Sequence, residues 1–276
     1  MRGVDMARRN NKFTDFLADF FAIKRSRKKI KREEAIVVTD TLNTVNECYN
    51  ALKDNLLFMT DIEHNKVIQI DSCVSGEGKT TLGANLAVSL SFNEKKVLVV
   101  DLDFRKPRVN KLFEVPNENG LVDYISNKIP FEKLIKKTAY ENVDVITRGS
   151  SIYNPSFLFT SDSFKSLIAR LRDEYDVIIL DAPPILQISD YIHISAVSDG
   201  VLFVVCYRKT RKSELEEATE LLAKANIKVI GAVMTRVDSK DPYSYYSGSY
   251  KSYYGRYYGH NYYNHNYGYG QYGDKQ

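Results

Sequence analysis

The chain of 276 residues contains 39 Lys or Arg and 35 Asp or Glu, which gives a net charge of +4 at pH 7. The excess of positive charge lies in residues 1–39 and 239–276, so the mildly acidic centre does not resemble a nucleic-acid-binding domain. The three cysteines are odd in number and lack a Cys-x-x-Cys spacing, which argues against a disulfide framework and against a zinc site.

An amphipathic stretch and a basic run lie near the start of the chain. Residues 13–23 carry five apolar side chains at helical spacing, namely Phe13, Phe16, Leu17, Phe20 and Phe21. Lys and Arg dominate residues 24–32, and this combination is typical of a membrane-surface element. A helix that docks on the domain or on a partner, followed by a solvated linker, is the alternative. Residues 1–39 are therefore predicted to form a separate segment.

Apolar runs in the sequence are too short to cross a bilayer. None reaches the roughly 18–20 residues that a membrane-spanning helix needs, and no signal peptide is visible. Together with the cysteine content, these features predict a cytoplasmic protein.

The central part of the chain alternates between helices and buried strands. After a predicted helix at residues 41–58, six apolar runs without polar alternation follow at 67–70, 97–100, 143–146, 177–180, 201–205 and 229–233. Such runs are typical of parallel strands buried on both faces. Helical stretches lie between several of them, at 80–91, 164–172 and 213–225. The pattern predicts an α/β domain over residues 40–238 with a doubly wound, mostly parallel sheet of six or seven strands.

A glycine-containing loop lies between the first predicted strand and the next helix, which is the context of a Walker A phosphate-binding loop. Gly76 and Gly78 allow the backbone to curl so that its N–H groups face phosphate oxygens. Lys79 is predicted to reach the β- and γ-phosphates, and the Thr80 hydroxyl to bind Mg²⁺. Cys73 occupies the usual position of the first glycine, which breaks the strict pattern. The predicted nucleotide-binding residues are Ser75, Gly76, Glu77, Gly78, Lys79, Thr80 and Thr81.

Three aspartates follow the ends of two later strands. Asp101 and Asp103 come after the run at 97–100, and Asp181 comes after the run at 177–180. Ligands of open α/β sheets bind at the carboxyl ends of the strands, so these carboxylates are expected to converge on the phosphates. For any one of them, a solvated or helix-capping aspartate is the alternative.

Tyrosine dominates residues 239–276, which contain thirteen of the twenty tyrosines and no Leu, Ile, Val or Phe. A segment so poor in aliphatic side chains cannot offset its ordering entropy, so a flexible, disordered C-terminal tail is expected. By itself the composition also fits a low-complexity Tyr/Gly segment. In a chain with a phosphate-binding loop, exposed phenols indicate an enzyme that phosphorylates itself. The candidate acceptors are Tyr243, Tyr245, Tyr246, Tyr250, Tyr253, Tyr254, Tyr257, Tyr258, Tyr262, Tyr263, Tyr267, Tyr269 and Tyr272.

Together, the Walker A loop, the Asp-x-Asp motif, the Asp-x-Pro-Pro motif and the tyrosine cluster resemble the bacterial tyrosine kinases of capsule and exopolysaccharide synthesis. The resemblance covers about residues 41–276 and implies a P-loop NTPase of the deviant-Walker type that uses ATP and Mg²⁺. It implies Lys79, Asp101 and Asp103 as catalytic residues, with Asp101 orienting and deprotonating the attacking phenol. It further implies Mg²⁺ binding by Thr80, Asp103 and Asp181, directly or through water.

The resemblance also implies partners. They are a membrane-embedded activator or polysaccharide co-polymerase, a cognate tyrosine phosphatase and further copies of this chain, with no nucleic acid. The chain would then lie at the inner face of the plasma membrane through its activator.

Two departures from the family pattern concern assembly and base selectivity. The oligomerisation pattern Glu-x-x-Arg-x-x-Arg reads Glu47, Asn50 and Lys53 here, and Asn cannot form a forked ion pair, so a ring would be weaker or differently built. Thr235 stands where an asparagine near the adenine is expected.

Two other functions remain open from the sequence. One is an ATPase of the positioning or partition type, which shares the fold but has an additional lysine where this chain has Val74, and has no tyrosine tail. The other is a nucleotide-gated scaffold whose tail binds a partner. Phosphotyrosine that depends on Lys79 would separate the kinase from both.

Overall fold

A computed structural model describes residue 36 and residues 44–59 and 66–237 of the chain. Contacts between residues divide the chain into two units, Met1–Thr235 and Arg236–Gln276. The fold described below belongs to the first unit. Apart from residue 36, the predicted N-terminal segment lies outside the described residues, as do all thirteen candidate acceptor tyrosines, so both remain predictions. No helix in the described ranges is both long and apolar enough to cross a membrane.

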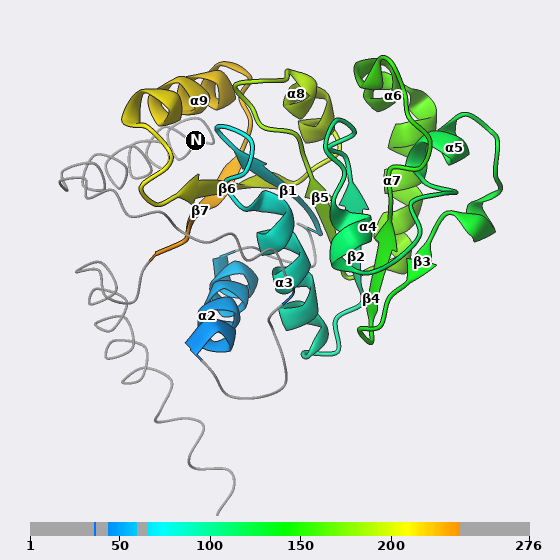
Figure 1. The fold of residues 1–276 in the computed structure, drawn as a ribbon, viewed down its shortest axis with the longest axis horizontal. Helices are drawn as coiled ribbons and strands as arrows, with labels where there is room; N and C mark the ends of the chain where they lie inside the picture. Colours follow the sequence, from blue (N-terminus) through cyan, green and yellow to red (C-terminus); the bar gives the residue numbers. More distant parts are fainter. Residues whose placement is uncertain (1–35, 37–43, 60–65, 238–276) are drawn as a thin grey trace, which may run out of the picture. The chain divides into compact units, whose positions relative to one another are not determined.

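The core of the fold is a seven-stranded sheet with the order β3-β4-β2-β5-β1-β6-β7 (Figure 1). All neighbouring strands are parallel except β3 and β4, which are antiparallel. The strands are β1 (Val67–Ser72), β2 (Val97–Asp101), β3 (Lys136–Lys137), β4 (Val143–Ile146), β5 (Val177–Asp181), β6 (Gly200–Cys206) and β7 (Val229–Thr235). The prediction of a mostly parallel sheet is confirmed, and the short edge strand β3 is an addition to it.

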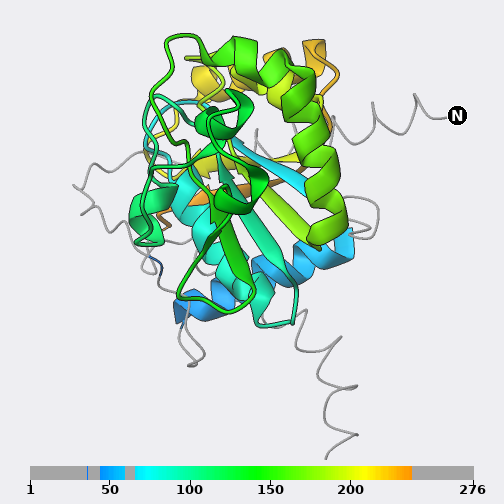
Figure 2. The same ribbon diagram turned by 90° about the vertical axis from the view of Figure 1, so that its right-hand side faces the viewer.

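Helices cover both faces of this sheet. They are α2 (Thr44–Met59), α3 (Lys79–Ser91), α4 (Val109–Leu112), α5 (Leu121–Ile125), α6 (Pro155–Thr160), α7 (Asp162–Glu174), α8 (Asp190–Ser195) and α9 (Lys212–Lys224), with a 3-10 turn at Phe131–Lys133. Figure 2 shows α3 and α7 on opposite sides of the sheet. The long helices match the predicted ones, whereas α4, α5, α6 and α8 are too short to give a periodic signal.

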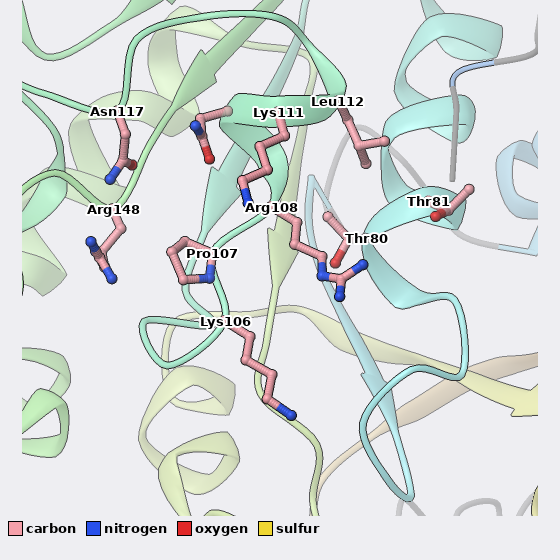
Figure 3. Close-up of a pocket in the computed structure, with 10 residues that line it drawn as sticks. Thr80, Thr81, Lys106, Pro107, Arg108, Lys111, Leu112, Asn117 and Arg148 are labelled. Carbon is pink, nitrogen blue, oxygen red and sulfur yellow. The ribbon is translucent and has the colours of Figure 1, made fainter. Parts of the chain in front are cut away.

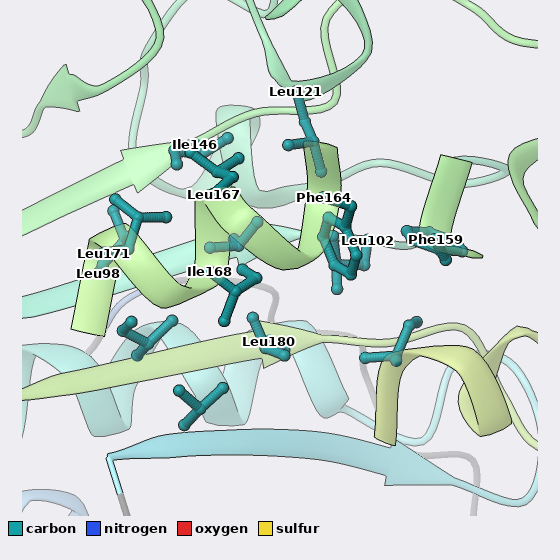
Figure 4. Packing of buried hydrophobic residues seen from close by; sticks show 14 of the residues in the cluster. Leu98, Leu102, Leu121, Ile146, Phe159, Phe164, Leu167, Ile168, Leu171 and Leu180 are labelled. Atoms are coloured by element: carbon teal, nitrogen blue, oxygen red, sulfur yellow. The ribbon is translucent and has the colours of Figure 1, made fainter. Parts of the chain in front are cut away.

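Alternate residues of each strand supply the two halves of the core. Val97 and Val99 of β2 pack with α3, whereas Leu98 and Val100 pack with α7. On the second face, Leu167 and other apolar residues of α7 point toward the strands (Figure 4). Since both faces of the central strands are buried, predominantly apolar runs are what this sheet requires.

Two of the three positions that correspond to the family's oligomerisation pattern hold helix α2 to α3 and to the turn that follows α3. The Ser89 hydroxyl donates to Asn50 Oδ1 at 3.1 Å. The buried Lys53 ammonium donates to Asn93 Oδ1 at 2.7 Å. Asn50 and Lys53 therefore make contacts within one chain.

Candidate functional site

The loop between β1 and α3 has the backbone of a phosphate-binding loop. Gly76 and Gly78 have φ values of 77° and 101°, a region that residues with a Cβ rarely adopt. The loop closes onto the N-terminal end of α3, a helix of 13 residues, where unpaired N–H groups and the helix dipole favour an anion. The arrangement can hold the phosphates of a nucleotide.

Buried polar contacts hold this loop in place from below. The fully buried Glu77 carboxylate accepts hydrogen bonds from the Val74 N–H at 2.9 Å and from the Thr210 hydroxyl. The Glu77 carbonyl oxygen accepts a hydrogen bond from the Thr235 hydroxyl at 2.7 Å. The side chain of Glu77 thus serves the loop itself, and Thr235, expected near the adenine, supports the same loop from β7.

Cationic side chains surround the loop. Lys79 is only 5% exposed, and its ammonium donates to the Ser72 hydroxyl at 3.1 Å. From the outside, Lys209 donates to the Ser75 carbonyl at 2.6 Å and Lys106 to the Ser75 hydroxyl at 3.4 Å. Lysine side chains therefore lie against this loop on its buried side and on its solvent-exposed side.

Two of the predicted aspartates lie side by side at the carboxyl ends of adjacent strands. Asp101 of β2 is paired in register with Asp181 of β5, and both are buried. Asp101 Oδ2 accepts the backbone N–H groups of Arg108 and Val109, at 3.0 and 3.1 Å. Asp101 Oδ1 and both carboxylate oxygens of Asp181 have no hydrogen-bond partner among the described residues.

Burial and neighbouring negative charge raise the pKa values of these aspartates. Burial raises the pKa of Asp101 well above its usual range, and the charge of Asp181 raises it further. Burial also raises the pKa of Asp181 to about 6, against the opposing effect of Lys79. The Thr80 hydroxyl lies close enough to lower that pKa without forming a hydrogen bond of good geometry. Buried carboxylate oxygens without partners are costly, so the site suits a bound cation.

Asp103 lies two residues beyond β2 and is half-buried. Its Oδ1 accepts the Lys106 backbone N–H at 3.1 Å, and its charge acts on the pKa of both Asp101 and Asp181. Among the described residues, no group of three or more His, Cys, Asp or Glu side chains could hold a metal by itself. Magnesium in nucleotide sites is usually bound by one or two carboxylates together with substrate phosphates, so Thr80, Asp103 and Asp181 fit such an ion.

A further buried carboxylate, Asp71, was missed by the sequence analysis. Asp71 Oδ2 accepts a hydrogen bond from Gln69 Nε2 at 2.6 Å, and its Oδ1 has no partner in the part of the chain described. Burial raises the pKa of Asp71 to about 7, against the opposing effect of Lys79. Asp71 lies at the end of β1, so the strand-end argument applied to Asp101 and Asp181 would have found it.

A cationic cleft of about 600 Å³ opens beside the phosphate-binding loop (Figure 3). One wall is formed by Thr80 and Thr81 of α3, and the others by residues of 106–112 together with Asn117 and Arg148. Four of its ten lining residues are Lys or Arg and none is acidic.

Comparison with known proteins identifies the family. Residues 65–229 match the AAA_31 family, an AAA domain. The chain is 35% identical over 208 residues to the putative tyrosine-protein kinase CapB of Staphylococcus aureus, covering 75% of this chain and 91% of CapB. It is 33% identical over 227 residues to the tyrosine-protein kinase YwqD of Bacillus subtilis, covering 82% of this chain and 96% of YwqD. The structure is similar to the kinase domain of the Escherichia coli tyrosine kinase ETK, with a TM-score of 0.71, 29% identity and coverage of 78% and 85%. The chain therefore belongs to the bacterial tyrosine kinases and is a protein-tyrosine kinase.

Proposed function

We propose that this kinase uses ATP and Mg²⁺ to phosphorylate tyrosines of its own residues 243–272. The observation that carries the proposal is the group of buried oxygens of Asp101 and Asp181 that have no hydrogen-bond partner in the described part of the chain, beside Lys79 and the phosphate-binding loop. A bound cation, the phosphates of a nucleotide and an acceptor phenol would supply what these groups lack. Thirteen phenols in the same chain supply the acceptors.

The roles of the site residues follow from their surroundings. The loop from Ser75 to Thr81 holds the phosphates, and Lys79 neutralises charge that develops on the transferred group. Thr80, Asp103 and Asp181 hold Mg²⁺, directly or through water. When bound, the ion supplies charge neutralisation at the phosphate oxygens.

Asp101 is suited to receive the proton of the acceptor. Two backbone N–H groups fix its Oδ2, which leaves Oδ1 to orient a phenol. In the transfer, the bond from the γ-phosphorus to ADP breaks, a bond to the tyrosine oxygen forms, and the phenol proton passes to Asp101. Because the pKa of Asp101 is raised, it differs less from the pKa of a phenol, which titrates near 10.

The separate roles proposed for Asp101 and Asp103 predict different effects of replacing each one with alanine. Asp103→Ala is expected to weaken Mg²⁺-nucleotide binding about tenfold or more, because it removes a metal ligand. Asp101→Ala is expected to slow transfer by about 10²–10⁴-fold, as for loss of a general base, with nucleotide still bound. Calorimetry with Mg²⁺-ADP and a phosphotyrosine assay measure the two quantities. Equal loss of nucleotide affinity in both variants would contradict the division of roles.

We further propose that the kinase regulates polymerisation and export of a capsular polysaccharide or exopolysaccharide. It would act at the inner face of the plasma membrane through a membrane-embedded activator or polysaccharide co-polymerase, as a homo-oligomer opposed by a tyrosine phosphatase. The similarity to CapB and to a putative tyrosine-protein kinase in a cps region of Klebsiella pneumoniae, at 30% identity, supports this proposal.

Mass spectrometry tests the autokinase directly. The full chain, purified from a host without tyrosine kinases, is treated with phosphatase and then incubated with Mg²⁺-ATP. Phosphotyrosine is expected within residues 243–272. When tyrosines there are changed to Phe, the loss of phosphorylation is expected to depend on how many are changed rather than on which ones. A partition-type ATPase or a scaffold would hydrolyse or bind ATP and leave every tyrosine unmodified, which would overturn the proposal.

A further inference from the structure

The cationic cleft beside the phosphate-binding loop has an unbalanced charge. It is lined by Lys106, Arg108, Lys111 and Arg148 and by no acidic residue. Within residues 44–59 and 66–237, no carboxylate forms an ion pair with Lys106, Lys111 or Arg148. Lys106, Lys111 and Arg148, gathered in one concave surface without a carboxylate partner among the described residues, create a field that favours an anionic ligand.

One of these cations, Arg148, is held in place before any ligand arrives. The Arg148 guanidinium donates to the carbonyl oxygens of Phe104 and Gly149, both at 3.2 Å. Gly149 packs so tightly on Gly120 that a Cβ added at Gly120 would lie 2.2 Å from the Gly149 nitrogen. The exposed Lys106 makes a longer contact, of 3.4 Å, with the Ser75 hydroxyl. A preorganised cation loses less entropy when it binds, which favours recognition of a compact anion.

The walls of the cationic cleft include or contact residues of the proposed transfer site. Thr80 and Thr81, which form one wall, lie in the first turn of α3. Arg108, in another wall, donates its backbone N–H to Asp101 Oδ2 at 3.0 Å. Figure 3 shows Arg108 beside Thr80, with Arg148 and Asn117 farther along the cleft. An anion at the far end would thus lie next to the transfer site rather than on the nucleotide.

Phosphorylation changes the charge of the tyrosine-rich residues 242–273, and with it their attraction to the cationic cleft. Residues 242–273 contain Lys251 and Arg256 but no Asp or Glu, so the unmodified segment is cationic and is repelled. Each phosphate adds about −1.5 to −2 charge and three strong acceptor oxygens. Eight of the acceptors form adjacent pairs, at 245–246, 253–254, 257–258 and 262–263.

We propose that the cationic cleft binds a phosphotyrosine of a segment that has already been phosphorylated once, and so presents the neighbouring tyrosine for the next transfer. The inference rests on the proposed function and adds the form of substrate that the site prefers. Adjacent Cα atoms are about 3.8 Å apart, and Arg108 of the cleft wall contacts Asp101, so a phosphate anchored in the cleft would bring the second phenol of a pair toward Asp101. The first phosphorylation would then accelerate the following ones.

Binding of synthetic peptides tests the cleft. Fluorescence anisotropy compares the peptide of residues 250–259 with the same peptide carrying phosphate on Tyr254, using phosphatase-treated full chain without ATP. The phosphopeptide is expected to bind at least tenfold more tightly at low salt, with the difference shrinking as salt rises. Equal affinity at low salt would overturn the proposal, as would equally tight binding of a peptide with glutamate at position 254.

Matched variants locate the site. Lys111→Gln, and the double change with Lys106→Gln, are expected to remove most of the preference for phosphate. Arg105→Gln, which removes an equal charge from an exposed neighbour that does not line the cleft, is expected to keep it. A preference that survives the double change, or phosphopeptide that saturating ADP displaces competitively, would place binding elsewhere and overturn the proposal.

Kinetics test the directing role. With Mg²⁺-ATP, the phosphorylated peptide is expected to have a KM at least several-fold below that of the unmodified peptide, with little change in kcat. Equal KM values would overturn the directing role. The binding measurement involves no phosphoryl transfer, so its failure would leave the autokinase intact, and a chain without kinase activity could still show phosphotyrosine binding.

Discussion

Replacing Lys79 with methionine is expected to abolish tyrosine phosphorylation of the chain while leaving it folded. Lys79 is nearly buried and is the only residue of the phosphate-binding loop region 72–81 with a cationic side chain. Loss of one preorganised donor to a developing negative charge typically costs about 10²–10³-fold in rate, and here the donor also carries a full charge. Methionine has a similar length, so packing is largely kept while the charge is lost.

The measurement is phosphotyrosine content by mass spectrometry, paired with circular dichroism to confirm folding. Lys224→Met is the matched control, because Lys224 lies exposed on α9 and pairs with Glu220 at 3.3 Å. It is expected to retain full activity. Phosphotyrosine that persists in the Lys79→Met chain, in a host without other tyrosine kinases, would contradict assignment of transfer to this site.

The positions of the strands could be predicted from the sequence because buried strands require runs of apolar residues. Apolar runs at 97–100 and 177–180 became β2 and β5, each extended by the aspartate that ends it. The pairing of Asp101 with Asp181 follows from the rule that parallel strands end at one edge. Helix α3 begins one residue before its predicted start, since Gly78 in a left-handed conformation sets the boundary.

Contacts between distant loops could not be predicted in the same way. The bond from Thr210 to Glu77 joins residues 133 positions apart, and neither shows a periodic pattern that indicates the other. Arg148 reaches the cleft because a close contact between Gly120 and Gly149 fixes its loop. Such contacts depend on three-dimensional packing of irregular segments, for which hydrophobic periodicity carries no signal.

The stability of the nucleotide-free chain is expected to fall as pH rises from about 4 to about 7. Burial raises the pKa of Asp71 to about 7 in the folded chain, whereas an unfolded aspartate titrates near 3.8. Between these values the folded chain binds more protons than the unfolded chain, so the free energy of unfolding decreases with rising pH. At 1.36 kcal/mol per pKa unit, Asp71 alone accounts for up to about 4 kcal/mol. Asp101 and Asp181, whose pKa values are also raised, act in the same direction.

Asp71→Asn tests this origin of the pH dependence. The amide oxygen can still accept the hydrogen bond from Gln69, but the side chain never becomes charged, so the variant is expected to be more stable than the parent chain at pH 8. Denaturant unfolding at pH 5.5 and pH 8 measures the change, with the exposed Asp173→Asn as control. Saturating Mg²⁺-ADP should reduce the pH dependence in the parent chain, because added positive charge stabilises the ionised carboxylates near Lys79. A parent chain whose stability is unchanged between the two pH values would show that Asp71 is ionised at little cost, and that the pocket around it is more polar than its burial indicates.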